Sequence, residues 1–264
     1  MDNFIIGLLG GVNILGYYSQ ARYLIDASNT IIAPVSQSVS FPVYSKVQDN
    51  DVKLKEAHRI QNYFLIRIML PISLIIFLFP TELIMLLFGE KWKVAASAMR
   101  WLALYPAIMA VFQNLKMLLY SIERVGATIY VYLVQILVAI SLITLGFNYF
   151  SIQGAAIGFM ITIILGTLSI YIYSWKYTSE SLKANVLAPL FSSLVTSIII
   201  FYLKNYYLHK PTLIMLFGLG VMTVILYLAV LFFIERRSLI KNILIIYNHL
   251  SSSIPGTLAN KYKK

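Results

Sequence analysis

Long apolar segments recur along this chain with only short connections between them. A transmembrane helix needs about 20 consecutive, mostly apolar residues. Eight segments approach or meet this length: residues 3–18, 24–44, 62–79, 95–120, 127–147, 152–174, 186–203 and 212–234. Charged residues make up only 12% of the chain, against about 25% in a typical soluble domain. We therefore predict an all-α, polytopic helical membrane protein with about eight transmembrane helices.

The chain is predicted to form one transmembrane helical unit over residues 1–234, followed by a short cytoplasmic segment. Within residues 235–250, apolar side chains recur at helical spacing opposite Arg236 and Arg237. This pattern is typical of an amphipathic helix that lies on the membrane surface. Residues 251–264 are predicted to be a disordered basic tail.

The net charge of +11 sets the expected orientation of the chain in the membrane. Cytoplasmic loops of membrane proteins are enriched in Lys and Arg. If the eight spans alternate, thirteen cations fall on one side, and five, including Arg22, fall on the other. We therefore expect both termini in the cytoplasm, where the cations also contact anionic membrane lipids. This placement of the positive charge argues against nucleic acid as a partner.

No residue pattern indicates an enzyme, a metal site or a bound cofactor. The chain has no cysteine, and its three histidines, His58, His209 and His249, are far apart in the sequence. The apolar segments hold no paired carboxylates, no phosphate-binding glycine loop and no nucleophile with its base. We therefore predict no catalytic residues and no cofactor.

The second apolar segment carries a stripe of small and polar side chains. On a regular helix, one face of residues 24–44 would hold Asn29, Ser36, Gln37 and Ser40. Such residues can hydrogen-bond between helices, each contributing about 1 kcal/mol or less. They can also line a hydrophilic cavity that contacts sugar hydroxyls, which is the interpretation that we favour.

Three cations lie within the predicted spans. Arg67, Arg100 and Lys116 each lie close enough to a span end for the charge to reach the membrane surface. Arg67 and Lys116 enter from the cytoplasmic side, and Gln113 shares a helical face with Lys116. We predict that these three residues form a cationic patch for a phosphate or pyrophosphate headgroup. Arg100 points roughly 160° away from Lys116 on a straight helix, but is retained with Arg22 as a further substrate-binding candidate.

Asp26 is the carboxylate closest to the predicted cavity wall. It could bind a coupling ion, or it could pair with Arg22, which lies four residues earlier. The spacing favours the pair, and both interpretations remain open. Further along, Gly154 and Gly158 predict a face on which two helices pack closely.

Several short motifs lie mainly at the start of the chain and continue to about residue 160. They are Asn3-x-x-Ile6-Gly7 with Gly10, Leu15-Gly16-Tyr17-Tyr18-Ser19-x-Ala21, Phe41-Pro42-x-x-Ser45-Lys46-x-Gln48-Asp49, Leu87-Phe88-Gly89-Glu90-Lys91-Trp92 and Gly154-Ala155-Ala156-Ile157-Gly158. Together these motifs resemble the polysaccharide-export flippases of the multidrug/oligosaccharidyl-lipid/polysaccharide exporter superfamily.

This resemblance implies an inner-membrane flippase for an undecaprenyl-pyrophosphate-linked oligosaccharide, used in lipopolysaccharide, capsule or exopolysaccharide biosynthesis. Such flippases have 12 to 14 spans in two lobes around a central cavity and work by alternating access. The eight predicted spans resemble the second half of such a bundle, so we expect a truncated or split transporter. A separate N-terminal half and the polysaccharide polymerase machinery are then expected partners. The alternatives are a cation-coupled multidrug exporter of the same superfamily, and an inactive or partner-requiring membrane fragment.

Overall fold

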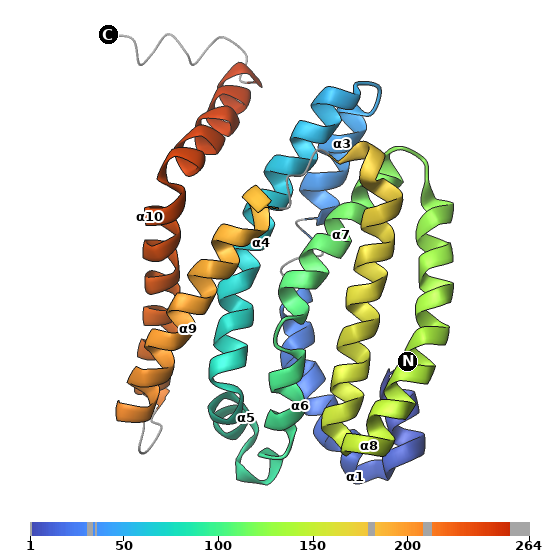
Figure 1. Ribbon diagram of the computed structural model, residues 1–264, viewed down its shortest axis with the longest axis vertical. Coiled ribbons are helices and arrows are strands. Elements are labelled where there is room, and N and C mark those ends of the chain that lie inside the picture. Colours follow the sequence, from blue (N-terminus) through green and yellow to red (C-terminus); the bar gives the residue numbers. More distant parts are fainter. Residues whose placement is uncertain (1, 31–33, 35, 179–182, 208–212, 254–264) are drawn as a thin grey trace.

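Every regular element of the described chain is helical. The computed structural model describes residues 2–30, 34, 36–178, 183–207 and 213–253 (Figure 1). The elements in chain order are α1 (Asp2–Ala27), the π-helix η1 (Ser36–Ser40), α3 (Phe41–Val47), α4 (Asp51–Leu78), α5 (Pro80–Phe88), the 3₁₀ helix η2 (Glu90–Trp92), α6 (Ala95–Leu102), α7 (Tyr105–Ser121), α8 (Val125–Ser174), the 3₁₀ helix η3 (Trp175–Tyr177), the π-helix η4 (Lys183–Leu187), α9 (Ala188–Tyr207) and α10 (Leu213–Ser253).

The structure supports a polytopic membrane protein, but the predicted number of eight spans is not confirmed. Within the described residues, five helices are long and apolar enough to cross a membrane. The number rises to six if α6 and α7, which meet at a bend of 43°, form one broken span. Pro106 lies in the first turn of α7, where its missing backbone N–H is tolerated, so the predicted span 95–120 divides just before it.

Helix α8 is 50 residues long and consists of two antiparallel arms (Figure 1). The chain leaves helical geometry at Phe150 and Ser151, and Ser151 has φ 51°. The arms on either side of this break correspond to the predicted spans 127–147 and 152–174. Gly154 and Gly158 lie against the backbone of the first arm, so the predicted close packing at these glycines is confirmed.

The first chain reversal lies at Gly11, and this corrects the predicted boundaries of the first two spans. Spans at 3–18 and 24–44 would place a connection at residues 19–23, but α1 is helical there. Gly11 instead has φ 69° and ψ −176°, a conformation that is essentially restricted to glycine. The nine residues from Asp2 to Gly10 are therefore too short to span a membrane by themselves.

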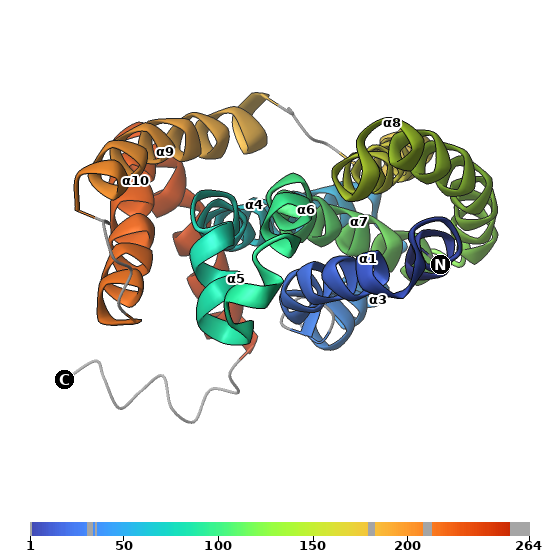
Figure 2. The same cartoon turned by 90° about the horizontal axis from the view of Figure 1, so that it is seen from below.

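The helices form a row with α4, α6 and α7 in the middle. The α9–α10 pair packs on one side of α4, whereas α1 and α8 lie on the opposite side of the molecule (Figure 2). The largest apolar core joins α1, α6 and α8, and includes Ile6, Ile25, Ala98, Leu102 and Ala155, all with 0% exposure. This core fixes α1 in the position from which its polar residues face α7.

Helix α10 continues beyond the predicted last span at 212–234. It bends at Glu235, which has φ −114° and ψ 15°, and then runs to Ser253. A helix over the predicted surface segment 235–250 is therefore present. Its amphipathic character remains a prediction, because side chains from Arg237 onward lie outside what is described. Residues 254–264, the greater part of the predicted tail, also lie outside the described residues.

Candidate functional site

Arg22 lies inside the helical bundle rather than in an outer loop. Since α1 runs without interruption from Val12 to Ala27, Arg22 is about 16 Å along the helix axis from the reversal at Gly11. This position corrects the charge count, which had placed Arg22 in an outer connection. Arg22 lies five residues before the end of α1, but its side chain is only 12% exposed, and a buried charge is costly unless it is paired.

The partners of Arg22 are two aspartates. Its Nε lies 3.2 Å from Asp2 Oδ2, and its Nη2 lies 3.0 Å from Asp26 Oδ1. The pair that the spacing of Arg22 and Asp26 favours is therefore present. The Tyr18 hydroxyl donates a hydrogen bond of 3.0 Å to Asp2 Oδ2. With one arginine and two aspartates, the formal charge of this group is −1.

This group extends to α7 through Asn29 and Tyr105. Asn29 Nδ2 donates to Asp26 Oδ1 and to the Tyr105 hydroxyl, both at 3.3 Å. The Arg22 guanidinium carbon lies 4.8 Å from the centre of the Tyr105 ring and 4.4 Å from that of Phe159. Such contacts stabilise a cation through the negative face of the ring. We call this polar group the Arg22 cluster; its members are Asp2, Tyr18, Arg22, Asp26, Asn29 and Tyr105.

The predicted polar stripe of residues 24–44 does not lie on one regular helix. Helix α1 ends at Ala27, and the chain resumes as a π-helix over Ser36–Ser40 before α3. A π-helix changes the angle between successive side chains, so the 100° spacing used for the prediction no longer applies. Gln37 is exposed and Ser40 is buried. The side chain of Ser36 lies outside the described part of the structure.

A second polar region lies on α7, and its residues recur at helical spacing. Met109, Gln113, Lys116 and Tyr120 are all partly exposed, whereas Leu115, Leu118 and Leu119 are fully buried. Helix α7 packs mainly against α4, α8, α3 and η1, with fewer contacts to α1, and these four side chains are only partly covered. We call these four residues the open face of α7.

Lys116 is the cation of the open face of α7. Its Nζ lies 5.9 Å from the centre of the Tyr120 ring, one turn further along the helix. Within the described residues, no carboxylate forms a salt bridge with it. Tyr105, at the start of the same helix, is eleven residues from Lys116, or about 16 Å along the axis. The open face therefore runs from the Arg22 cluster to an unpaired cation.

Arg67 does not join Lys116, and this corrects the predicted cationic patch. Its guanidinium is buried against Glu235 of α10, with Nε donating to Oε2 at 2.8 Å and Nη2 donating to both carboxylate oxygens. Nη1 donates to the backbone carbonyls of Tyr63 and Asn185, at 2.8 and 3.4 Å. Since a guanidinium has five N–H donors, Arg67 has none left for a phosphate.

The remaining candidate, Arg100, is also separated from Lys116. It is exposed on α6, whereas Lys116 lies on α7 beyond the bend of 43° between the two helices. The structure thus brings together Arg22, Asp26 and Asn29 at one end and Gln113 and Lys116 at the other. Glu235 and Tyr105 were missed from the sequence. Glu235 is the first carboxylate after the last predicted span, and this position is the sequence feature that could have indicated its role.

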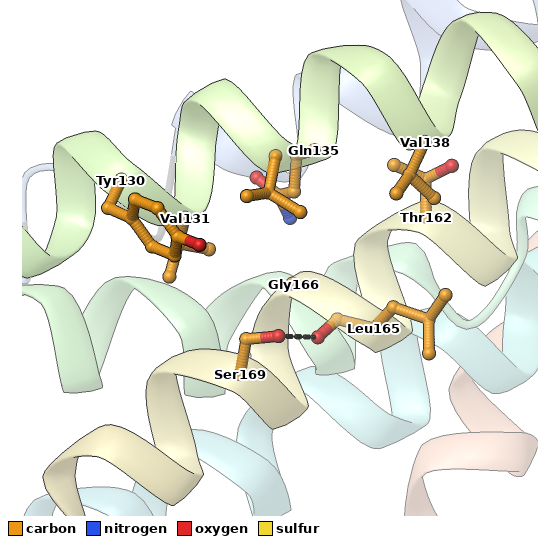
Figure 3. A pocket seen from close by; sticks show the side chains of 9 residues that line it. Tyr130, Val131, Gln135, Val138, Thr162, Leu165, Gly166 and Ser169 are labelled. Atoms are coloured by element: carbon orange, nitrogen blue, oxygen red, sulfur yellow. Dashed lines mark hydrogen bonds between the residues drawn. The ribbon is translucent and has the colours of Figure 1, made fainter.

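Two pockets of the described structure lie away from these residues. One, of about 70 Å³, lies between the arms of α8, where Gln135 faces Gly166 (Figure 3). The other, of about 480 Å³, lies between the α4–α5 corner and α10 and is lined only by apolar residues and Gly220. In the described part of the chain, no group of three or more acidic or histidine residues could hold a metal ion.

Comparison with known proteins gives a family and two relatives. The profile of a family described as polysaccharide biosynthesis protein matches residues 1–97. The chain is 22% identical over 225 residues to the lipopolysaccharide biosynthesis protein WzxC of Escherichia coli K12. It is 25% identical over 173 residues to an uncharacterized membrane protein in the cps region of Klebsiella pneumoniae.

These matches cover more of this chain than of the relatives. The first covers 84% of this chain and 42% of its relative, and the second covers 64% and 35%. The chain therefore spans less than half the length of the curated relatives it matches. No solved structure is significantly similar to it.

Proposed function

We propose that this chain, a relative of the polysaccharide biosynthesis membrane proteins, forms one lobe of a flippase for lipid-linked oligosaccharides. Its substrate would be a polyprenyl-pyrophosphate glycan, moved across the bacterial inner membrane by alternating access. The observation that carries this proposal is the open face of α7, which runs from the Arg22 cluster to Lys116.

Lys116 is suited to the pyrophosphate group. A cation in the membrane interior is expensive unless it has a counter-charge, and Lys116 has no carboxylate partner in the described structure. A phosphate oxygen would supply that charge through a short, charge-assisted hydrogen bond. Gln113, three residues earlier on the same face, can donate to a second phosphate oxygen.

The open face requires a second wall for transport to occur. Alternating access needs two halves that move against each other around one binding site. Since the chain spans less than half of its relatives' lengths, we propose that a separate N-terminal half supplies this wall. The polysaccharide polymerase machinery would then receive the product. Both termini of this chain are proposed to be cytoplasmic, which places Lys116 in the inner half of the membrane.

The test is binding of polyprenyl pyrophosphate to the purified chain in lipid nanodiscs. Replacing Lys116 by Gln should weaken binding by about tenfold or more, because a hydrogen bond to a charged group contributes about 1.5–3 kcal/mol. The matched control is Lys93→Gln, which removes one exposed cation outside α7 and should leave affinity unchanged. Equal affinity of the wild type and Lys116→Gln would contradict the assignment of Lys116.

One observation favours the second candidate, a cation-coupled drug exporter. The Arg22 cluster has a formal charge of −1, and the side chain of Asp26 is 45% exposed. Such a carboxylate can bind a proton, a metal cation or a lipophilic cation. Three results would fit this candidate: the wild type binds a lipophilic cationic dye, the Asp26→Asn variant does not bind it, and the wild type does not bind polyprenyl pyrophosphate. Binding of neither ligand would fit an inactive or partner-requiring fragment.

A further inference from the structure

We propose that the Arg22 cluster is a sugar subsite that accepts a neutral, hydroxyl-rich ring and disfavours an acidic one. This inference rests on the proposed function, since it assigns the glycan part of the same substrate. It replaces the polar stripe of residues 24–44 as the sugar contact, because that stripe is not formed on one helix.

The cluster has one unused donor and one unused acceptor. Arg22 Nη1 and Asn29 Oδ1 are both buried, and neither has a hydrogen-bond partner. Each such group costs free energy unless it is paired. Arg22 and Asp26 are four residues apart and share one face of α1, and Asn29 follows three residues later, just beyond the end of that helix. A sugar hydroxyl both donates and accepts, and therefore matches this pair of groups.

The charge of the cluster determines which sugars it can accept. Arg22 is already held between two carboxylates, at 3.2 and 3.0 Å, so its charge is neutralised within the protein. The partly exposed Asp26 carboxylate is left to face the ligand. A uronic acid would place a second carboxylate beside it, and such like-charge contacts are a common basis for rejecting a wrong ligand. A neutral hexose would instead donate its hydroxyls to Asp26.

Tyr132, on the first arm of α8, supplies a flat surface next to α7, the helix that carries Tyr105 and Lys116. Its ring is 38% exposed and is held edge-on by the buried Phe112, with ring centres 5.7 Å apart. An aromatic face contacts the C–H face of a sugar ring, while the phenol hydroxyl can bond to its rim.

The two ends of the site also fix the direction of the substrate. Tyr105 and Lys116 are separated by about 16 Å along α7. Pyrophosphate at Lys116 would therefore place the glycan toward Tyr105 and the Arg22 cluster. In the bound substrate, the pyrophosphate would lie near Lys116, and the glycan would extend toward the end of the bundle that holds Gly11.

The test uses the full chain in nanodiscs and three ligands: polyprenyl pyrophosphate without a sugar, with a neutral hexose and with a hexuronic acid. The wild type should bind the neutral glycolipid most tightly and the acidic one at least tenfold more weakly. Asp26→Asn should reduce this discrimination by about tenfold. Tyr132→Leu should weaken only the two glycolipids, and Tyr132→Phe, which keeps the ring, should retain most of their affinity. Lys116→Gln should weaken all three ligands alike.

The outcomes separate this inference from the proposed function. If the wild type, Asp26→Asn and Tyr132→Leu each bind all three ligands with equal affinity, the proposed sugar subsite is wrong. The proposed recognition of lipid pyrophosphate would not be contradicted by that result. If the acidic glycolipid binds most tightly, the assigned charge preference is wrong. If none of the three binds to a chain that elutes as a folded, monodisperse species, the proposed function fails and the subsite fails with it.

Discussion

Arg67 and Lys116 show how similar positions in a sequence can lead to different roles. Each lies about five residues from an end of its predicted span, and each could in principle serve a ligand. Arg67 is 5% exposed and directs every N–H donor to the protein, whereas Lys116 is partly exposed and has no carboxylate partner within the described residues. Arg67 is therefore a structural residue that joins α4 to α10 and to η4, which directly precedes α9.

The Arg67–Glu235 pair gives a prediction for stability. Either Arg67→Gln or Glu235→Gln leaves one buried charge without its partner, which typically costs about 3–5 kcal/mol. The double variant Arg67→Met with Glu235→Leu removes both charges and should lose less than either single variant. The measurement is unfolding in detergent, followed by circular dichroism.

The control for this prediction is Arg100→Gln, which removes an exposed arginine and should change stability by about 0.5 kcal/mol or less. Single variants as stable as the wild type would show that Glu235 does not hold Arg67. A double variant less stable than both single variants would show that packing, and not the isolated charge, dominates at this position.

The sequence predicts local contacts better than distant ones at this scale. Arg22 and Asp26 are four residues apart, so helical geometry alone brings them together. Arg67 and Glu235 are 168 residues apart, and their contact depends on how α10 packs against α4. No periodicity within either helix could indicate that contact. For the same reason Asp2, which depends on the reversal at Gly11, was missed as a partner of Arg22.

Among the helices, α8 depends most clearly on its glycines. A Cβ atom built on Gly154 would lie within van der Waals overlap of the Gly146 carbonyl oxygen on the other arm. Gly154→Ala should therefore separate the arms and destabilise the protein by about 3 kcal/mol or more, since overpacking a close contact costs 1–3 kcal/mol even where neighbours can shift. Here the neighbour is backbone, which cannot rotate away.

The matched control for α8 is Gly218→Ala in α10. Nothing lies within 4 Å of a Cβ at Gly218, so alanine should be tolerated there and should stabilise the helix by about 0.5–1 kcal/mol. Thermal unfolding of both variants should give shifts of opposite sign. A Gly154→Ala variant with wild-type stability would mean that the two arms do not pack as closely as the structure has them.

The break in α1 is an element that the sequence does not locate. Gly7, Gly10, Gly11 and Gly16 all lie in the first apolar segment, and nothing in their spacing selects one of them. Only Gly11 takes a positive φ, of 69°. Gly11→Ala should therefore cost about 1–3 kcal/mol of stability, measured by thermal unfolding. The control is Gly126→Ala at the start of α8, where nothing lies within 4 Å of an added Cβ. An equally small change in stability for both substitutions would exclude a strained reversal at Gly11.

For the whole molecule, the class of fold and the family resemblance could be predicted from the sequence, and both are confirmed. Apolar segments of spanning length are a strong signal, because the backbone must satisfy its own hydrogen bonds in lipid. The number of spans is not confirmed, since a break within an apolar segment leaves little trace in composition. The placement of α9 and α10 beside α4 also depends on side-chain contacts that the sequence pattern does not reveal.

The orientation of the whole molecule in the membrane remains a prediction. With Arg22 inside the bundle, four cations remain on the proposed outer side, against thirteen on the proposed inner side. Because the chain has no cysteine, single cysteines can test this orientation directly. In intact cells, a membrane-impermeant thiol reagent should label Lys93→Cys from outside and should leave Gln48→Cys unlabelled until the cells are opened.

The same reagent can show whether the open face of α7 is wet. A thiol reacts as its thiolate, which forms in water and not in lipid. Leu137 is 68% exposed on α8 and Gln113 is only partly exposed, so exposure alone would favour a cysteine at position 137. If α7 faces a hydrophilic cavity and that side of α8 faces lipid, Gln113→Cys should nevertheless react at least tenfold faster in membranes. Faster labelling of Leu137→Cys would place the aqueous surface on α8 and would remove Lys116 from the transport pathway.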